Sequence, residues 1–338
     1  SISYFNGDEL AATTWMNKYA MKDKDGEFVE RSPDDMHKRM AKEFGRIEAD
    51  YKLKYNLNGS AKFLSKYGQE REDLTEEKVY KYFKDFGHII PQGSVMSSLG
   101  NSYQLASLSN CIVVPELHDS YGGVFYTDQQ LAQLFKRRCG VGVDISNLRP
   151  TGASVSNAAK STSGAVSVMN RFSDTTREVA QNGRRGALML SMDIAHPDVK
   201  EFITIKQDLQ KVTGANISIR LSDEFMNAVE TNSEYTHKWP IDSNTPKFTK
   251  TVNAKELWDT IIECAHNTAE PGLIFWDRQH WYSTSSVYPG YKNTSTNPCS
   301  EIAMQGGDSC RLIAMNLYNF VENPFTKDAK FLMEDFYK

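Results

Sequence analysis

An amide, a thiol and a carboxylate stand at alternate positions in one short stretch of this sequence, at Asn297, Cys299 and Glu301. In an extended or looped segment alternate side chains leave the backbone on the same side, so the three groups are predicted to face one cavity. A second thiol follows at Cys310, and the intervening Gly306–Gly307 pair allows the chain to fold back and bring the two sulfurs together. This set of groups is suited to redox chemistry.

A further thiol, Cys111, precedes the run Ile112-Val113-Val114, which is typical of a buried strand. The stretch that leads into it from Ser94 is rich in serine and glycine, and its backbone and hydroxyl groups could donate hydrogen bonds to a phosphate. We therefore take Ser94, Ser109 and Asn110 as candidate substrate-binding residues. The alternative for Cys111 is plain packing at a strand end.

The elements that must position these groups are of two kinds. The first hundred residues predict helices, one starting at Ser32-Pro33 and one at Thr75, each with an apolar stripe. From Cys111 onward strands and helices alternate, which favours a parallel sheet with crossover helices. The predicted elements are a helix capped by Thr127-Asp128, a helix over 161–180, a strand over 216–220, a helix over 254–267 and a strand over 271–277.

Several patterns are excluded or interpreted as structural. Gly140-Val141-Gly142 lacks the third glycine of a dinucleotide-binding fingerprint, because position 145 is isoleucine. The five cysteines include no Cys-x-x-Cys pair, which argues against a zinc site and a secreted disulfide framework. Cys139 and Cys264 are predicted to be structural, His196 is predicted to start a helix, and no metal site is expected.

The composition limits the possible partners. The 338 residues carry a net charge of −4, so no basic excess indicates a nucleic-acid partner. The apolar stretches are far shorter than the roughly 20 residues that span a bilayer, and we expect a cytoplasmic protein without membrane association. The length allows about two domains, predicted as a helical region over 1–93 and a second domain over 94–338.

The motif Asn297-x-Cys299-x-Glu301, with Ser309-Cys310 and Asn316-Leu317 downstream, resembles the active-site finger loop of ribonucleotide reductase catalytic subunits. This resemblance implies an α/β fold in which a helical N-terminal region precedes a ten-stranded α/β barrel made of two five-stranded halves. The chain would supply the first half and the finger loop. The second half-barrel is not recognisable in the sequence, so we expect a split or truncated catalytic subunit that needs the missing C-terminal half.

The resemblance also implies a role for each reactive side chain. Cys299 would become a thiyl radical that removes the 3′ hydrogen of a ribonucleotide, and Glu301 would accept the 3′-OH proton. Asn297 would bind the ribose hydroxyls. Cys111 and Cys310 would supply a proton and two electrons and end as a disulfide, which a thioredoxin-like reductant would reduce again.

A nucleotide effector site is implied as well. In the family an Asp-Ser pair holds the effector ribose and an arginine opens the phosphate loop, matching Asp119, Ser120 and Arg149 here. Arg184 and Arg185 lie between glycines and would link the dNTP or ATP effector to the substrate. Their alternative is a solvated helix end. The effector face is expected to form a homodimer.

The source of the radical is predicted from one spacing. The eleven-residue step from Cys299 to Cys310, together with Pro298, resembles the adenosylcobalamin-dependent class II enzymes. A class I subunit with a separate radical-generating subunit is the alternative, and a non-catalytic nucleotide-binding regulatory module is another. Diphosphate and triphosphate substrates are both left open.

Overall fold

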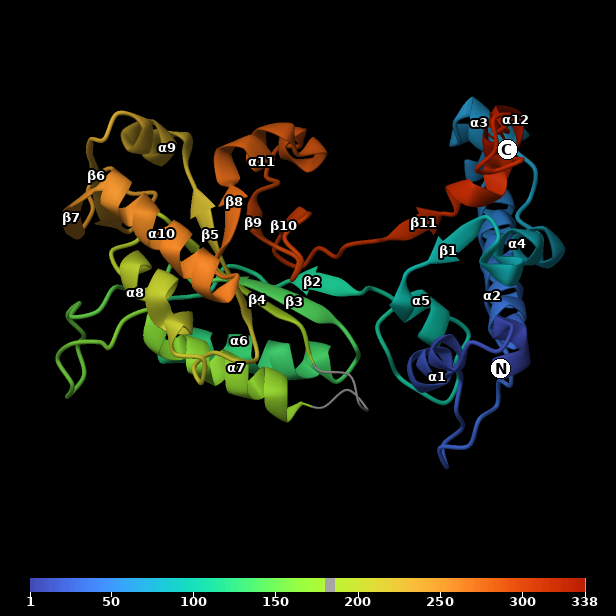
Figure 1. The fold of residues 1–338 in the computed structure, drawn as a ribbon, viewed down its shortest axis with the longest axis horizontal. Coiled ribbons are helices and arrows are strands. Elements are labelled where there is room, and N and C mark those ends of the chain that lie inside the picture. The colour runs from blue at the N-terminus through green and yellow to red at the C-terminus, as the bar shows by residue number, and fades with distance from the viewer. Residues whose placement is uncertain (180–185, 338) are drawn as a thin grey trace. The chain divides into compact units, whose positions relative to one another are not determined.

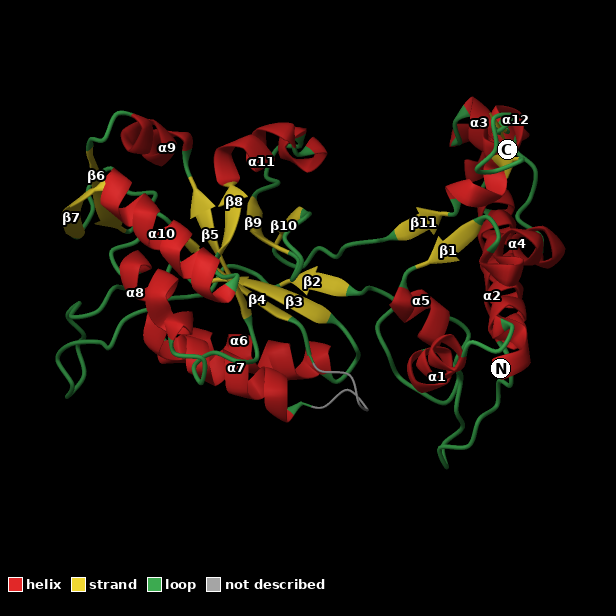
Figure 2. Cartoon of the chain, in the orientation of Figure 1, coloured by secondary structure: helices red, strands yellow, loops and turns green. Residues whose placement is uncertain are grey.

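The chain consists of two compact units (Figure 1; Figure 2). The computed structural model describes residues 1–179 and 186–337. One unit comprises Ser1–Asn110 and Arg311–Lys338, and the other comprises Cys111–Cys310. The first is mainly helical and the second contains a parallel sheet with helices, which confirms the predicted fold class.

The first unit combines helices with short antiparallel strand pairs. Its helices are α1 (Glu9–Lys18), α2 (Pro33–Leu57), α3 (Lys66–Glu70), α4 (Glu76–Phe83), α5 (Gly93–Ser98) and α12 (Met333–Tyr337). Strand β1 (Ile89–Pro91) pairs with β11 (Ile313–Met315), and β12 (Val321–Glu322) pairs with β13 (Lys330–Phe331). The β1–β11 pair joins the C-terminal segment of the chain to the N-terminal helices.

Helix α2 begins at Pro33, as the sequence predicts. The backbone N–H of Ser32 donates to the carboxylate of Asp35 at 3.0 Å and closes a capping box. Met36 and Met40 on its inner face are fully buried and form one hydrophobic core with α4. The predicted apolar stripe is therefore the core of this unit.

The second unit is built on a five-stranded parallel sheet with the strand order β2-β3-β4-β5-β8 (Figure 2). These strands are β2 (Cys111–Val113), β3 (Gly140–Asp144), β4 (Leu188–Asp193), β5 (Asn216–Leu221) and β8 (Gly272–Phe275). The helices are α6 (Tyr121–Phe135), α7 (Met169–Glu178), α8 (Val199–Thr204), α9 (Asp223–Glu230), α10 (Ala254–Thr268) and α11 (Trp276–Tyr282). Antiparallel hairpins form from β6 (Glu234–Trp239) with β7 (Phe248–Asn253), and from β9 (Asn293–Thr296) with β10 (Ala303–Gln305).

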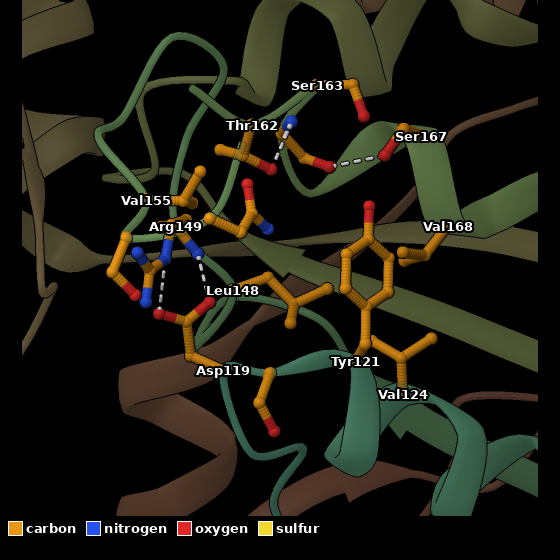
Figure 3. A pocket seen from close by; sticks show the side chains of 14 residues that line it. Asp119, Tyr121, Val124, Leu148, Arg149, Val155, Thr162, Ser163, Ser167 and Val168 are labelled. Atoms are coloured by element: carbon orange, nitrogen blue, oxygen red, sulfur yellow. Dashed lines mark hydrogen bonds and ion pairs between the residues drawn. The ribbon is translucent and has the colours of Figure 1, made fainter. Parts of the chain in front are cut away.

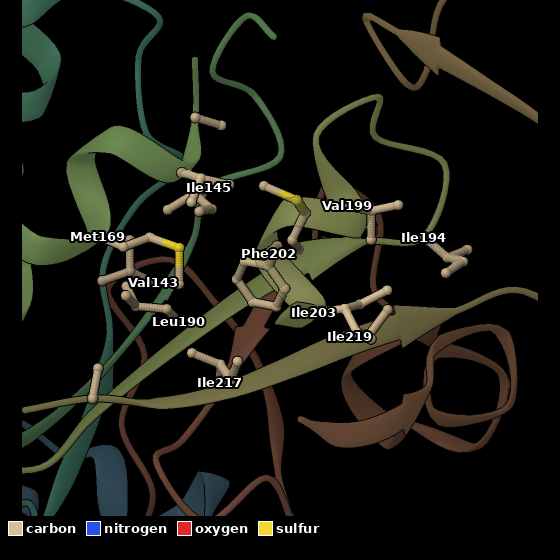
Figure 4. Packing of buried hydrophobic residues seen from close by; sticks show 14 of the residues in the cluster. Val143, Ile145, Met169, Leu190, Ile194, Val199, Phe202, Ile203, Ile217 and Ile219 are labelled. Carbon is tan, nitrogen blue, oxygen red and sulfur yellow. The ribbon is translucent and has the colours of Figure 1, made fainter. Parts of the chain in front are cut away.

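One face of the sheet is apolar. Side chains alternate between the two faces of a strand, so one register of β3, β4 and β5 shares a face. This register belongs to the main hydrophobic core and consists of Val141, Val143, Leu188, Leu190, Met192, Ile217, Ile219 and Leu221. Figure 4 shows Phe202 of α8 close to Leu190 and Ile217 in this core. The helices that pack here set the position of the strands.

The opposite face of the same strands is mostly polar or small. Its residues include Gly142, Asp144, Ser191, Asp193, Ser218 and Arg220, together with the apolar Met189 near the start of β4. Parallel strands that are covered on both faces usually read as nearly continuous apolar runs. A polar register inside buried strands therefore marks a face that is reserved for polar contacts or for chemistry.

Strand β9 of the hairpin lies on this polar face. A Cβ atom added to Gly142 would come within 1.8 Å of the carbonyl oxygen of Thr296, so β9 approaches β3 at a distance that only glycine permits. The hydroxyls of Ser191 and Ser295 are 3.0 Å apart and hydrogen-bonded. The hairpin is thus seated on the sheet by backbone proximity and by polar side chains.

The predicted start of one helix is wrong. Helix α6 begins at Tyr121 and not at Thr127-Asp128, because Ser120 supplies the N-cap and its Oγ accepts from the N–H of Gly123 at 3.0 Å. Thr127 is buried inside the helix. Thr and Asp are also acceptable within a helix when a neighbouring element binds them, and Asp128 accepts a hydrogen bond from Thr175 of α7.

The helix predicted over 161–180 is also shorter than expected. Gly164 has φ +86°, in the left-handed region that interrupts a right-handed helix, and α7 begins only at Met169 after a 3₁₀ turn over Val166–Val168. Residues 161–165 belong instead to a loop. Among the described residues, no helix combines the length and apolar character needed to cross a membrane.

The contact between β3 and β9 leads to a stability prediction. Gly142→Ala should lower the free energy of unfolding by about 1–3 kcal/mol, because its methyl group overlaps the Thr296 carbonyl and the hairpin must shift. Urea unfolding followed by circular dichroism measures this. Gly122→Ala is the matched control, since its Cβ would meet only the Ser120 hydroxyl at 3.7 Å and alanine favours helix α6. Equal stability of Gly142→Ala and the wild-type chain would contradict the seating of the hairpin.

Candidate active site

Residues 297–302 join β9 to β10 as a tight turn. The N–H of Ser300 donates to the carbonyl of Asn297 at 2.9 Å, and Ser300 has φ +71°. The N–H of Ile302 donates to Oδ1 of Asn297 at 3.0 Å. Because of this turn Asn297 is buried, whereas Cys299 and Glu301 are exposed. The segment is looped and not extended, so the three reactive side chains differ in accessibility.

The amide of Asn297 is only half satisfied. Its Oδ1 accepts from Ile302, but its Nδ2 is buried and has no hydrogen-bond acceptor among the described residues. A buried donor without a partner costs about 1–3 kcal/mol, so such groups generally serve a purpose. The turn itself is anchored to β5, because Nδ2 of Asn216 donates to the carbonyl of Pro298 at 3.3 Å. The position of the turn is thus fixed by the bonds that Ile302 and Asn216 make to its backbone and to Asn297.

Cys299 keeps its proton at neutral pH. Partial burial raises the pKa of its thiol, and the Glu301 carboxylate and the Cys310 thiol raise it further. A thiolate beside a carboxylate is disfavoured because the two charges repel. The Cys299 sulfur therefore carries a hydrogen atom, and the Cys299, Glu301 and Cys310 side chains are near enough to influence one another.

Cys111 and Cys310 stand opposite each other. Residues 307–310 run antiparallel to β2, with a bridge between Ile112 and Ser309. The N–H of Cys310 donates to the carbonyl of Cys111 at 3.0 Å. Directly opposed residues in antiparallel strands have Cα atoms about 4.5–5.5 Å apart, which lies within the range of about 4.4–6.8 Å that a disulfide requires. The predicted proximity of these two thiols is present in the structure.

Both cysteines are free thiols in a low-dielectric environment. Cys310 is buried and Cys111 is half-buried. Burial raises the pKa of the Cys111 thiol well above its usual range, and its contact with the Cys310 thiol raises it further. Gly306 makes the close pairing possible, because a Cβ there would lie 2.5 Å from Cα of Pro115. The Cys111 thiol therefore keeps its proton at neutral pH, beside the buried Cys310.

A buried ion cluster holds the other end of β9. Nε of Arg220 lies 3.3 Å from Asp144 Oδ2, and its Nη2 lies 3.1 Å from Asp193 Oδ2. Its Nη1 donates to the carbonyl of Thr294 at 3.2 Å. Burial raises the pKa of Asp193, and the neighbouring Arg220 opposes this effect. Arg220 therefore links three strands of the sheet to the hairpin, and its loss would leave the buried Asp144 and the half-buried Asp193 without a cationic partner.

The predicted effector residues line one pocket (Figure 3). Asp119, Ser120 and Arg149 face a cavity of about 260 Å³. The remaining lining residues are Tyr121, Val124, Leu148, Val155, Ser156, Asn157, Thr162, Ser163, Gly164, Ser167 and Val168. The many hydroxyls and the exposed ring of Tyr121 provide polar and stacking contacts in one place. Such a combination is suited to a nucleotide.

Arg149 and Asp119 pair across the mouth of this pocket (Figure 3). Nε of Arg149 donates to Asp119 Oδ2 at 2.8 Å, and its backbone N–H donates to Asp119 Oδ1 at 3.1 Å. Nη1 of Arg149 also donates to the carbonyl of Ser154 at 2.8 Å. Ser120 is occupied as the N-cap of α6. A ligand that binds Arg149 must therefore share the guanidinium with Asp119 or displace it.

Other predicted site residues lie elsewhere or outside the described residues. Ser94, Ser109 and Asn110 belong to the first unit, where the N–H of Ser94 donates to Oδ1 of Asn110 at 2.9 Å. Arg184 and Arg185 lie outside the described residues. The first unit thus brings Ser94 and Asn110 together.

The residues interpreted as structural are buried in the fold. Cys139 is fully buried at the start of β3, where its thiol contacts the carbonyl of Gly140 at 3.4 Å. Cys264 lies in the main hydrophobic core on α10. His196 lies just before α8 in a turn, and its Nε2 bonds to the carbonyl of Leu148 at 2.8 Å. Among the described residues no group of acids, cysteines and histidines is arranged to hold a metal.

The sequence analysis missed the polar register of the sheet. Asp144, Asp193 and Arg220 support the hairpin, yet none of them is among the residues that the sequence predicts for the site. The signal was the alternation in β4, where Leu188, Leu190 and Met192 are interleaved with Ser191 and Asp193. Polar residues at alternate positions of a buried strand indicate a face in contact with a site.

Two family models match the chain in succession. The all-alpha domain of ribonucleotide reductase matches residues 5–102, and the barrel domain of ribonucleotide reductase matches residues 109–338. The boundary between them falls near the junction of the helical region and β2.

Curated relatives carry names that agree with these models. A vitamin B12-dependent ribonucleoside-diphosphate reductase of Thermoplasma acidophilum is 34% identical over 90% of this chain and 44% of its own length. A protein of the same name from Mycobacterium tuberculosis is 32% identical over 68% of this chain and 32% of its own length. The ribonucleoside-diphosphate reductase large chain of Neurospora crassa is 25% identical over 76% of this chain and 30% of its own length.

The chain spans less than half the length of these relatives. The similarity to the Thermoplasma acidophilum protein nevertheless covers 90% of this chain, and the two family models together cover both the helical region and the sheet with its hairpin. The chain therefore belongs to the ribonucleotide reductase large-chain family.

Proposed function

We propose that this chain carries the thiol chemistry of ribonucleotide reduction. The observation that supports this most strongly is that Cys111 of β2 lies directly opposite Cys310. Cys299 is also near this pair, since Cys310 raises the pKa of the Cys299 thiol. Cys299 is exposed, and the pair is buried or half-buried. This arrangement suits a reaction in which the accessible Cys299 initiates and the protected pair, Cys111 and Cys310, reduces the substrate.

In the proposed reaction Cys299 acts as a thiyl radical, removes the 3′ hydrogen of the ribonucleotide and returns it at the end. Glu301 accepts the 3′-OH proton as the 2′-OH, protonated by the dithiol, leaves as water, and it returns that proton when the 3′ carbonyl becomes a hydroxyl again. Cys111 and Cys310 deliver two electrons and the hydrogen that C2′ gains. Two S–H bonds and one C–O bond are lost, and an S–S bond, a C–H bond and an O–H bond of water form.

Asn297 has a separate task in this scheme. Its buried Nδ2 lacks an acceptor within the described chain, and a ribose hydroxyl or the developing carbonyl would supply one. Ser94, Ser109 and Asn110 remain our candidates for the substrate phosphate, since hydroxyl and backbone donors suit an anion. Relatives named ribonucleoside-diphosphate reductases favour a diphosphate substrate.

The names of the relatives favour adenosylcobalamin as the cofactor. The exposed Cys299 fits this group, because its sulfur is open to a bulky reactant that approaches from outside the turn. Bound cobalamin would supply the initiating radical. The alternative to cobalamin is a separate radical-generating subunit, from which the same exposed sulfur would accept the radical. A thioredoxin-like dithiol would reduce the Cys111–Cys310 disulfide, and the remainder of the barrel would complete the site.

The pocket at Asp119, Ser120 and Arg149 is proposed to bind a deoxynucleoside triphosphate or ATP as effector. The Arg149 guanidinium suits the phosphates, and Asp119 suits the ribose hydroxyl once its ion pair with Arg149 opens. Arg184 and Arg185 are proposed to link this effector to the substrate. This face is also the proposed homodimer contact.

A nucleotide-binding regulatory module without activity is a second candidate function. The observation that favours it is that one compact unit supplies every residue lining the pocket, although the chain spans 44% of its relative. Titration with dTTP and dATP, alone and with the remaining half of the barrel, separates the two functions. A regulatory module would bind nucleotide in both mixtures and reduce no substrate.

The opposed thiols lead to an oxidation prediction. Mild oxidation with diamide should produce a Cys111–Cys310 disulfide and leave Cys139 and Cys264 reduced, as mass spectrometry of peptides can determine. Because the pKa of Cys111 is raised and the thiolate is the reactive form, the rate should increase as the pH rises above neutrality. Cys139→Ser is the control and should not change this product. Preferential Cys299–Cys310 pairing would contradict the assignment.

Arg149 is expected to determine nucleotide affinity. Arg149→Ala should weaken dTTP or dATP binding about 10- to 100-fold in isothermal titration, because a charge-assisted phosphate contact is lost. Arg278→Ala removes an arginine of a comparable exposed pair, 3.2 Å from Asp223 and outside the pocket, and should bind normally. Unchanged affinity in Arg149→Ala would exclude this pocket as the effector site.

Replacing Cys299 and replacing Cys111 should stop the reaction at different steps. In an enzyme with the full barrel, Cys299→Ser should abolish exchange of the substrate 3′ hydrogen, because the serine O–H bond is too strong to yield the initiating radical. Cys111→Ser should block net reduction and still allow that exchange. Isotope release from 3′-tritiated substrate provides the measurement, and equal loss in both variants would refute separate roles.

A further inference from the structure

The loop that forms one wall of the effector pocket is held at both ends by a single carboxylate, that of Asp198. The N–H of Thr151 donates to both of its oxygens at 3.0 Å, and the N–H of Ala165 donates to Oδ2 at 3.0 Å. Thr151 Oγ1 adds a longer contact of 3.4 Å. The carboxylate is only 8% exposed, so water does not compete effectively for these bonds.

The positions that Asp198 joins are the two ends of the loop. The loop over residues 151–165 contributes Val155, Ser156, Asn157, Thr162, Ser163 and Gly164 to the wall of the pocket. The two N–H groups are fourteen positions apart in sequence, yet they meet at one side chain. Backbone bonds pair the two arms of the loop, from the N–H of Gly152 to the carbonyl of Thr162 at 2.9 Å and from the N–H of Thr162 to the carbonyl of Ala153 at 3.0 Å. Asp198 adds an anchor from outside the loop, which fixes both of its ends to the start of α8.

His196 reinforces this attachment. Its Nδ1 accepts from the N–H of Asp198 at 3.1 Å, and its Nε2 therefore carries the proton and donates to the carbonyl of Leu148 at 2.8 Å. Arg149 lies between the anchored residues Leu148 and Thr151. Its backbone is thus held on both sides before any ligand binds.

Gly164 shows how closely the parts fit. A Cβ at this position would lie 2.1 Å from Thr151 Oγ1 and 2.5 Å from Asp198 Oδ2, and its φ of +86° is already unfavourable for other residues. A side chain here would push the carboxylate away from the loop. The chain therefore keeps this position clear for the Asp198 bonds.

We infer that Asp198 is a positioning residue for the nucleotide pocket, which it shapes by tying together the two ends of the loop over residues 151–165. The inference rests on the proposed effector function of the pocket. Asp198 does not line the cavity, so it acts through the loop and not by touching the ligand. Its carboxylate is needed because three donors converge on it, and an amide would oppose one of them with its own N–H groups.

The test uses two readouts on the whole chain. Asp198→Asn should weaken dTTP or dATP binding about tenfold or more in isothermal titration. It should also accelerate trypsin cleavage after Lys160, an exposed residue in the middle of the loop, while the circular dichroism spectrum stays unchanged. Glu201→Gln, the same chemical change at an exposed position of α8, is the matched control and should alter neither readout.

Gly164→Ala provides a second, independent variant, because it disturbs the same contacts from the opposite side. Because Gly164 also lines the pocket, its informative readout is cleavage after Lys160, which should accelerate as in Asp198→Asn. This readout replaces that of Asp198→Asn if that variant does not fold. If wild-type chain fails to bind nucleotide, the proposed effector function is wrong, and Lys160 cleavage still decides whether Asp198 holds the loop. Cleavage rates in Asp198→Asn and Gly164→Ala that equal the Glu201→Gln rate would overturn the inference.

Discussion

The seating of the β9–β10 hairpin on the polar face of the sheet is the contact on which the candidate site depends. Gly142 lets the Thr296 carbonyl approach β3, and Arg220 binds the Thr294 carbonyl while it neutralises Asp144 and Asp193. Buried charges are tolerated only when they are paired, so the sheet and the hairpin stabilise each other. The turn that carries Cys299 is consequently supported at its base by groups that cannot move independently.

The arrangement of the thiols follows from that support. The segment that leaves β10 returns along β2 in antiparallel register, which sets Cys310 opposite Cys111. Burial keeps the pKa of the Cys111 thiol high, so at neutral pH it holds its hydrogen and resists casual oxidation. Radical chemistry requires such protection, because other reductants and water would otherwise consume the intermediate.

Strand β4 connects the two regions of the second unit that we assign to function. Ser191 in the middle of the strand bonds to Ser295 of the hairpin. The turn that follows the strand carries His196 and Asp198, which hold the loop beside the effector pocket. The strand thus contacts the hairpin along its length and leads at its end into the turn that anchors the pocket loop.

The sequence by itself determined the family, the helical start at Pro33, the alternation of strands and helices, and the residues with reactive groups. These follow from local signals, namely caps, apolar periodicity and the Asn297-x-Cys299-x-Glu301 spacing. It did not determine where α6 begins, because Ser120 and Thr127 are both suitable N-cap residues and only the fold selects one of them. It did not determine where α7 begins either, because a glycine in the sequence does not show whether its backbone is left-handed, as that of Gly164 is. Only the tertiary structure decided that Arg220 supports the hairpin and that Asp198 closes the loop, since both bind partners distant in sequence, and such pairings depend on how strands and turns come together in space.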